Sequence, residues 1–162
     1  MFQPSVRPAD AADDVIRLYG DTLYRLCLTL LGSEADAEDA VQETLLRYLQ
    51  KAPAFADAAH QKAWLLKVAA NQCRDMLRFR ARHPQTPIDA WEGFAGDTAD
   101  REILEALMTL PEKYRLVLVL YYVEDYRIDT IAQIIGRTPS AVKMRLQKGR
   151  RLLEAAYRKE LD

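Results

Sequence analysis

The sequence has few of the residues that build catalytic and metal sites. Its 162 residues include two histidines and two cysteines, and it contains neither an HExxH nor a CxxC motif. These spacings are the usual signatures of zinc sites. A GxxxxGK[ST] phosphate-binding loop and a GxGxxG motif are also missing from the sequence. We therefore expect no catalytic residue, no metal and no cofactor, and a protein that is not an enzyme.

Long apolar runs are lacking as well. No stretch approaches the roughly 20 apolar residues that a membrane-spanning helix needs, and the first residues, MFQPSVRPADAADD, do not have the pattern of a signal peptide. Cys27 and Cys73 each lie among apolar residues with helical spacing, so we expect reduced thiols in the core. These features predict a cytoplasmic protein without membrane insertion.

Neither sign of charge dominates the chain as a whole, but the charges are segregated along it. The net charge is −1 and the pI about 6.2. Glu34–Glu43 holds five acidic residues in ten positions, whereas Lys62–Arg82 holds six basic residues and one acidic residue. Arg137–Arg151 holds six basic residues and no acidic one. Such blocks indicate separate surfaces for phosphate groups and for protein partners.

The basic segment near the C-terminus has the signals of a DNA-binding helix. Thr138 can cap a helix and Pro139 suits its first position. Just upstream, Ile128–Gly136 is a shorter apolar-periodic segment that ends at a glycine. Two short helices joined by a tight turn, the second one basic, predict a helix-turn-helix. A solvated basic helix at the end of a bundle remains the alternative from these residues alone.

Helical periodicity continues along almost the entire chain, which predicts an all-α fold. In the first half we expect three helices, over about 11–31, from Ser33 to Pro53, and over about 57–82. In the second half we expect one helix after Asp100, one over 112–123, and the two helices of the helix-turn-helix. Residues 84–100 lack this period and contain two prolines and two glycines. We expect two small separable helical domains, residues 1–83 and 101–162, joined by this linker.

Three stretches resemble one protein family in their order and spacing. They are DAEDAVQETLLRYLQ (Asp36–Gln50), KAWLLKVAANQCRDMLRFRAR (Lys62–Arg82) and the stretch from LPEKYR to the end of the basic helix (Leu110–Leu153). Together they resemble the extracytoplasmic-function sigma factors of bacterial RNA polymerase. The resemblance implies a sigma region 2 bundle, a sigma region 4 helix-turn-helix, and promoter-specific initiation of transcription.

The resemblance also implies partners and site residues. The partners are core RNA polymerase, through its β′ coiled coil and β flap, promoter DNA, and an anti-sigma factor. The positions implied to meet the β′ coiled coil are Asp39, Gln42 and Glu43. The residues expected at minus-10 DNA are Phe55, Lys67, Asn71, Arg74 and Arg78, with Phe55 in the loop that receives a flipped base. The residues expected at minus-35 DNA are Ser140, Lys143, Met144, Gln147, Lys148, Arg150 and Arg151.

Departures from the family pattern fall mainly in the helix-turn-helix. Met144 replaces a usual serine, Gln147 a histidine or aromatic residue, and Gly149 a common alanine. The resemblance implies that the first two positions face bases, so the promoter sequence stays open. The alternative function is a free-standing helix-turn-helix regulator with an N-terminal ligand-binding helical domain, although no long apolar stripe suggests dimerisation. A third is an adaptor or anti-sigma protein, which would not need the basic helix.

Overall fold

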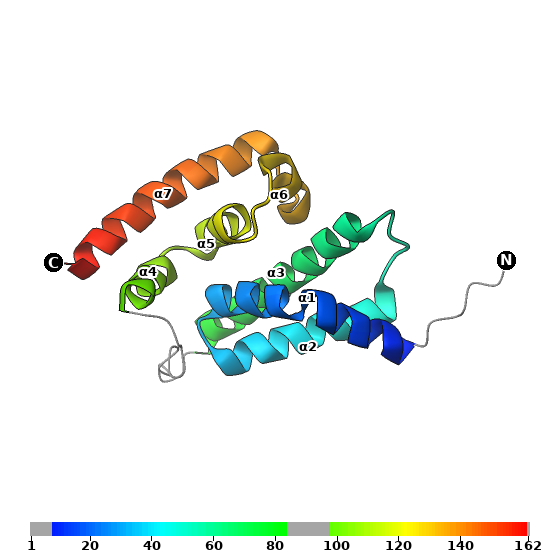
Figure 1. Ribbon diagram of the computed structural model, residues 1–162. Helices are drawn as coiled ribbons and strands as arrows, with labels where there is room; N and C mark the ends of the chain where they lie inside the picture. The colour runs from blue at the N-terminus through cyan, green and yellow to red at the C-terminus, as the bar shows by residue number, and fades with distance from the viewer. Residues whose placement is uncertain (1–7, 84–97, 162) are drawn as a thin grey trace.

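The first half of the chain forms a bundle of helices. The structure is a computed structural model that describes residues 8–83 and 98–161. Helices α1 (Pro8–Leu31), α2 (Glu34–Lys51) and α3 (Ala58–Arg82) pack pairwise on one another. Figure 1 shows them in blue, cyan and green, with α2 running back along α1. The structure thus confirms the helical segments expected in this half.

The ends of these helices follow local chemistry that the sequence predicts. Gly32, with a φ of 64°, ends α1 in the left-handed conformation that glycine adopts readily. The Ser33 hydroxyl accepts a hydrogen bond from the N–H of Asp36 at 3.3 Å and so caps α2. The Asp57 carboxylate caps α3 by accepting from the N–H of His60 at 2.8 Å.

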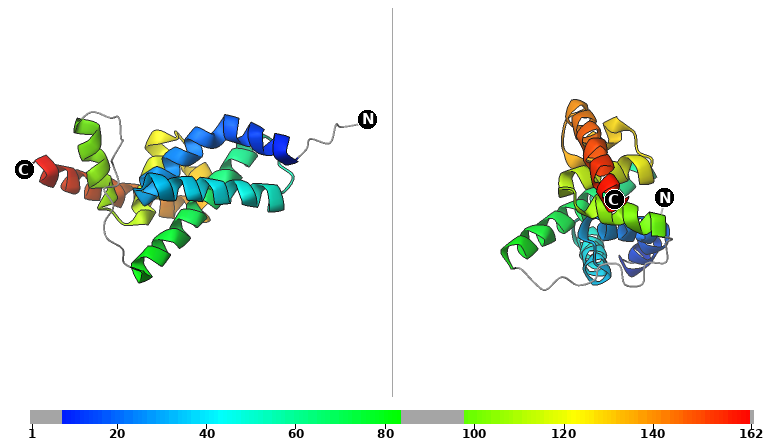
Figure 2. Two further views of the ribbon diagram at one scale, coloured as in Figure 1. Left: turned by 90° about the horizontal axis from the view of Figure 1, so that it is seen from below. Right: turned by 90° about the vertical axis from the view of Figure 1, so that its left-hand side faces the viewer.

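The second half is built around the long final helix. Its elements are α4 (Thr98–Met108), α5 (Glu112–Leu118), the π-helix η1 (Val119–Val123), α6 (Ile128–Ile135) and α7 (Pro139–Leu161). Helix α7 packs on α4, α5 and α6. The two views of Figure 2 agree that α7 lies on the side away from the bundle of α1–α3. Its exposed face is therefore turned away from the first half.

Two details differ from the expectation. Helix α4 begins at Thr98, inside the range expected for the linker, and residues 84–97 lie outside the described residues. The single helix expected over 112–123 changes at Val119 into a π-helix, which ends where the N–H of Glu124 donates to the Val119 carbonyl at 3.0 Å. Asp125 then adopts a φ of 58°, a conformation that aspartate tolerates better than most residues.

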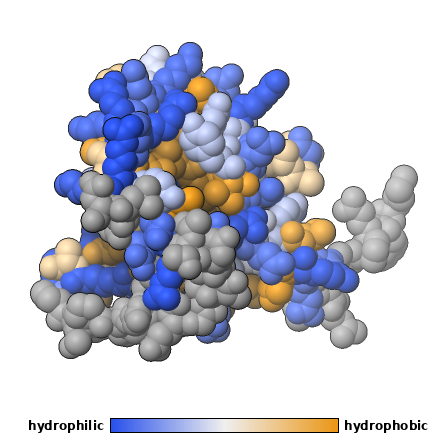
Figure 3. Space-filling model, turned by 60° about the vertical axis from the view of Figure 1, so that its left-hand side comes forward, coloured by the Kyte–Doolittle hydropathy of each residue, from blue (hydrophilic) through white to orange (hydrophobic). Residues whose placement is uncertain are grey.

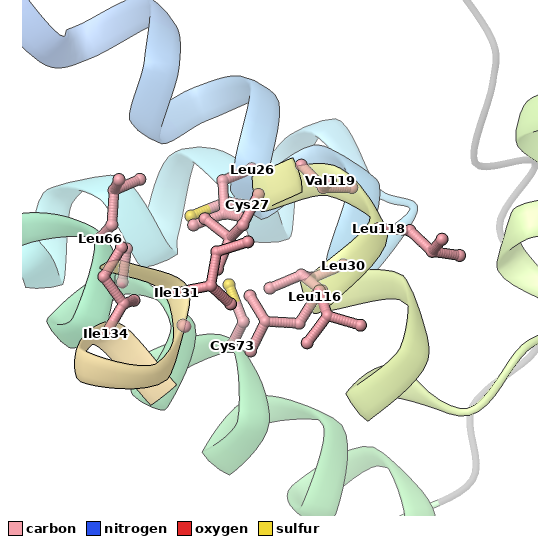
Figure 4. Close-up of a cluster of buried hydrophobic side chains, with 14 of the residues drawn as sticks. Leu26, Cys27, Leu30, Leu66, Cys73, Leu116, Leu118, Val119, Ile131 and Ile134 are labelled. Carbon is pink, nitrogen blue, oxygen red and sulfur yellow. The ribbon is translucent and has the colours of Figure 1, made fainter. Parts of the chain in front are cut away.

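The two halves share one apolar core. Leu26 and Leu30 of α1, Leu116 of α5 and Ile131 of α6 are all fully buried, and their elements meet through α1–α5 and α3–α6 contacts. Figure 4 shows these side chains pointing toward one another from both halves. Burial of apolar surface therefore holds the halves together. Separability of the halves stays a prediction.

Both cysteines lie in this shared core. Cys27 and Cys73 are free thiols with no exposed surface. A hydrogen bond to Cys27 and burial both raise the pKa of the Cys73 thiol far above its ordinary value. Figure 4 places both sulfur atoms among the leucine and isoleucine side chains. The expectation of reduced core thiols is confirmed.

Candidate nucleic-acid and polymerase interfaces

The helix-turn-helix is fixed by local signals and by two buried anchors. Gly136 closes α6 in the left-handed region, with a φ of 67°. The Thr138 hydroxyl accepts a hydrogen bond from the N–H of Ala141 at 3.1 Å, so α7 begins where the sequence predicts. Val142 and Leu146 of α7 are buried, at 0% and 1% exposure. These anchors decide which face of α7 points outward.

The candidate minus-35 residues are all exposed on α7. Ser140, Met144, Gln147 and Arg151 follow one another at steps of four, three and four, which places them on one helical face. Met144 is 71% exposed, the most exposed of the large apolar side chains described. We call these four residues the outward strip; it is opposite the buried anchors.

Two basic residues flank this strip and contact tyrosines. The ammonium of Lys148 lies 5.7 Å from the centre of the Tyr114 ring. Burial opposes ionisation of Tyr114, but the ammonium groups of Lys148 and Lys113 outweigh it and lower the pKa of Tyr114. Arg150 donates to the Tyr122 hydroxyl at 3.1 Å. Arg150 and Lys148 are therefore positioned by the body of the second half.

The candidate minus-10 residues of α3 are only partly free. Lys67 and Asn71 are exposed, and Arg78 lies 3.7 Å from the carboxylate of Asp75 one turn away. Arg74 differs, because its Nε lies 3.2 Å from the carboxylate of Glu112 at the start of α5. The second half thus neutralises one expected DNA-binding arginine, which the sequence pattern did not indicate.

Phe55 lies in a short loop supported by aromatic rings. The α2–α3 loop (residues 52–57) begins where Pro53 prevents continuation of α2. The Phe55 ring is parallel to that of Tyr48, with centroids 6.3 Å apart, and meets Trp64 edge-on at 5.8 Å. The half-buried Phe55 side chain is therefore held against α2 and α3 while its loop stays exposed.

The candidate polymerase-binding residues share the outer side of α2. Asp39 and Gln42 are exposed, and Glu43 forms a half-exposed ion pair with Arg47 at 3.5 Å. Leu46 follows on the same side and is 49% exposed. Sequence reasoning did not select Leu46, although its spacing of three from Glu43 and four from Gln42 could have indicated it. The surface therefore combines carboxylates with an apolar side chain.

The carboxylates at the start of α2 make this region electronegative. Burial, and after it the carboxylates of Glu34 and Glu38, raise the pKa of Tyr24 on the neighbouring helix α1. A surface of this sign suits a basic protein partner.

Contacts between the halves were not predicted from the sequence. Arg25 of α1 lies 2.9 Å from the carboxylate of Glu124, whose side chain is only 4% exposed. The Lys62 ammonium lies 5.4 Å from the centre of the Tyr126 ring. Burial, then Glu124 and Tyr19, raise the pKa of Tyr126 to about 12. The charged residues involved are far apart in sequence, so no periodicity could pair them.

An apolar groove opens on the second half. It has a volume of about 380 Å³ and is lined by Ile103, Leu118, Tyr122, Leu153 and Tyr157, with Arg150 and Glu154 beside them. The face drawn in Figure 3 carries apolar surface, in orange, with hydrophilic side chains around it. Among the described residues no group of three or more His, Cys, Asp or Glu side chains could hold a metal ion.

Comparison with known proteins decides the family. The Sigma-70 region 2 model matches residues 15–83, and the Sigma-70 region 4 model matches residues 100–153. The ECF RNA polymerase sigma factor SigM of Mycobacterium tuberculosis H37Rv is 31% identical over 144 residues, which cover 86% of this chain and 74% of SigM. This chain belongs to the ECF sigma factors. The ECF sigma factor SigW of Bacillus subtilis is 29% identical over 170 residues. This alignment covers 92% of this chain and 90% of SigW.

Two solved structures share this fold. The sigma factor RpoE of Bartonella quintana, crystallised with the anti-sigma factor NepR, matches with a TM-score of 0.74 at 22% identity, over 90% of this chain and 96% of RpoE. CnrH in complex with the cytosolic domain of CnrY matches with a TM-score of 0.67 at 22% identity, over 91% of this chain and 87% of CnrH. The region 2 match falls on α1–α3 and the region 4 match within α4–α7, and these two halves are called region 2 and region 4 below. None of the described helices could span a membrane.

Proposed function

We propose that this sigma factor binds core RNA polymerase in the cytoplasm as a non-catalytic specificity subunit and recognises both promoter elements. The observation that carries the proposal is the ordered match to region 2 and region 4 over residues 15–83 and 100–153. The region 2 match accounts for the N-terminal half, so a ligand-binding regulator is not favoured. An anti-sigma factor is a further proposed partner.

The proposed polymerase contacts are on both halves. Asp39, Gln42 and Glu43, together with Leu46, form a mixed acidic and apolar surface on α2 that suits the β′ coiled coil. The apolar groove of region 4 suits a helix of the β flap, because apolar helix faces bind in such grooves. The two surfaces lie on different regions, so both can bind one polymerase.

The proposed DNA contacts divide between α3 and α7. Lys67, Asn71, Arg74 and Arg78 would follow the minus-10 strand, with Phe55 in the loop beside them. The outward strip, with Lys143, Lys148 and Arg150 next to it, would enter the minus-35 major groove. Arg74 can meet DNA only after its ion pair with Glu112 breaks. We infer that this ion pair breaks when the promoter binds, either by rotation of the Arg74 side chain or by movement of region 4 away from region 2.

Transcription in vitro tests this function. Core RNA polymerase is supplied with a library of DNA templates randomised over the minus-35 and minus-10 elements, with and without the protein. We expect transcripts enriched for one pair of elements at one spacing only when the protein is present. A regulator of the alternative class would enrich one DNA site in the absence of polymerase and would not direct initiation.

A further inference from the structure

The α2–α3 loop has few side chains that could fix its shape. Three of its six residues are alanine, and Phe55 has its only large side chain. Phe55 is half-buried against Tyr48 and Trp64, while the other residues of the loop are exposed. The position of the loop backbone thus depends on contacts supplied from neighbouring helices.

His60, in the first turn of α3, supplies two such contacts. Its Nδ1 accepts a hydrogen bond from the backbone N–H of Ala56 at 3.1 Å. Its ring meets the Phe55 ring edge-on, with centroids 5.3 Å apart. Because an N–H donates to Nδ1, the neutral ring carries its proton on Nε2. His60 therefore contacts two successive residues of the loop, Phe55 through its ring and Ala56 through its backbone N–H.

His60 is itself held in place by the start of α3. Its backbone N–H donates to the Asp57 carboxylate at 2.8 Å, which fixes the first turn of the helix. On the next residue, the Gln61 amide donates to the Tyr48 hydroxyl at 3.0 Å and so ties the same turn to α2. The acceptor on His60 is thus presented to Ala56 by a rigid helix end, an arrangement that orders a binding loop.

We propose that His60 is a positioning residue for minus-10 recognition, because its Nδ1 holds the Ala56 N–H and thereby sets the position of the loop that contains Phe55 and that we expect beside the promoter strand. The inference rests on the proposed function of the loop. His60 acts through the backbone of the loop, and its own contact with DNA is not required. What it must provide is a hydrogen-bond acceptor one bond beyond Cγ.

Two substitutions separate the acceptor from other effects. In His60→Asn the Oδ1 atom replaces Nδ1 at the same position along the side chain, whereas His60→Leu has the same branching and no acceptor. Leucine is the better helix former of the two. A role confined to the stability of α3 would therefore favour His60→Leu, the opposite of what the acceptor model predicts. His83→Leu, which removes the chain's other histidine, is the control.

The experiment measures the loop in the full-length free protein and in the holoenzyme. Hydrogen exchange reports protection of the Ala56 amide, and selection on templates randomised at minus-10 reports base preference. We expect His60→Leu to lose protection at Ala56 and to lower minus-10 discrimination by about threefold to tenfold, as expected for one net hydrogen bond. His60→Asn and His83→Leu should resemble the wild type in both measurements, and minus-35 preference should be unchanged in all.

Two results would overturn the inference. One is a His60→Leu variant with wild-type protection at Ala56 and wild-type minus-10 preference. The other is a His60→Asn variant as impaired as His60→Leu, which would assign the effect to the ring rather than to the acceptor. Failure of the wild-type protein to direct initiation would instead refute the proposed function, and the exchange measurement would still decide whether Nδ1 orders the loop.

Discussion

The guanidinium of Arg115 in region 4 donates a hydrogen bond to the backbone carbonyl of Leu30, 85 residues away in region 2, at 2.9 Å. Arg115 is 6% exposed and also donates to the Met108 carbonyl at 3.0 Å. Burial lowers the pKa of Arg115, and Glu112 offsets this only in part. Helix α1 has no basic residue in its last turn. Arg115 therefore supplies, from the other half of the molecule, positive charge of the kind that a helix C-terminus favours, beside Arg80 of α3, which donates to the Leu31 carbonyl at 2.7 Å.

Removal of this arginine should loosen the two halves. Arg115→Ala leaves the Leu30 and Met108 carbonyls without their donor, which should lower the free energy of unfolding by about 1–3 kcal/mol. Urea denaturation followed by circular dichroism measures the change. The control is Arg101→Ala, which removes an exposed ion pair with Glu105 and should cost less than about 1 kcal/mol. Equal effects of the two substitutions would contradict the structural role of Arg115.

Charge reversal on α2 should weaken polymerase binding. Asp39→Arg combined with Glu43→Arg places positive charge at one exposed and one half-exposed position that we expect to face a basic surface of the polymerase. The double variant should keep its helical circular dichroism and bind core polymerase at least about tenfold more weakly. Asp13→Arg with Asp21→Arg, two exposed positions of α1, provides the matched control. Co-purification of the α2 variant at wild-type yield would disprove this surface.

Limited proteolysis should cut the free protein first within residues 84–97. This expectation comes from the sequence, since the segment lies between α3 and α4 and contains two prolines and two glycines. Mass spectrometry identifies the first cleavage site, and size-exclusion chromatography then shows whether the nicked halves separate. First cleavage within a helix would show that the apolar residues Ile88, Trp91 and Phe94 are protected by docking.

Two basic residues of α7 should contribute differently to DNA binding. Lys143→Ala should cost about 1–3 kcal/mol at the preferred minus-35 sequence and relax preference at one or two base positions. Arg151→Ala should weaken binding to all sequences alike and lower the salt slope by about 1. Selection by the holoenzyme on randomised minus-35 DNA, at several salt concentrations, separates the two effects. Because Arg151 shares the outward strip with Met144, the reverse result would assign base contact to Arg151.

Gly149 tests how closely α7 packs on α5. A Cβ at Gly149 would lie 3.3 Å from the Cγ of Leu118, tight for a contact between carbons. Leu118 lines the apolar groove, so its side chain has room to shift. Alanine also favours a helix by about 1 kcal/mol over glycine. We therefore expect Gly149→Ala to raise the melting temperature slightly and Gly149→Val to lower it. A lower melting temperature for Gly149→Ala would mean that Leu118 cannot move.

Local chemistry determined much of this protein from the sequence alone. The starts of α2, α3 and α7 follow from Ser33, Asp57 and Thr138, because each cap involves residues within three positions of one another. The all-α class and the helix-turn-helix follow from periodicity, and the sigma factor family follows from motifs in their order. The exposed positions of α7 also follow from the sequence, because the apolar residues Val142 and Leu146 mark the face of the helix that is buried.

Tertiary structure alone decided how the halves meet. The sequence places Arg74 on a polar stripe of α3, but the fold pairs it with Glu112 of region 4. Arg115 has a partner nearby in sequence, the Met108 carbonyl, but its partner Leu30 is 85 residues distant. Ion pairs and hydrogen bonds of this kind depend on how helices cross in space, which helical periodicity does not encode. The hydrogen bond from the Ala56 N–H to His60 Nδ1 likewise depends on how the α2–α3 loop folds back onto the first turn of α3.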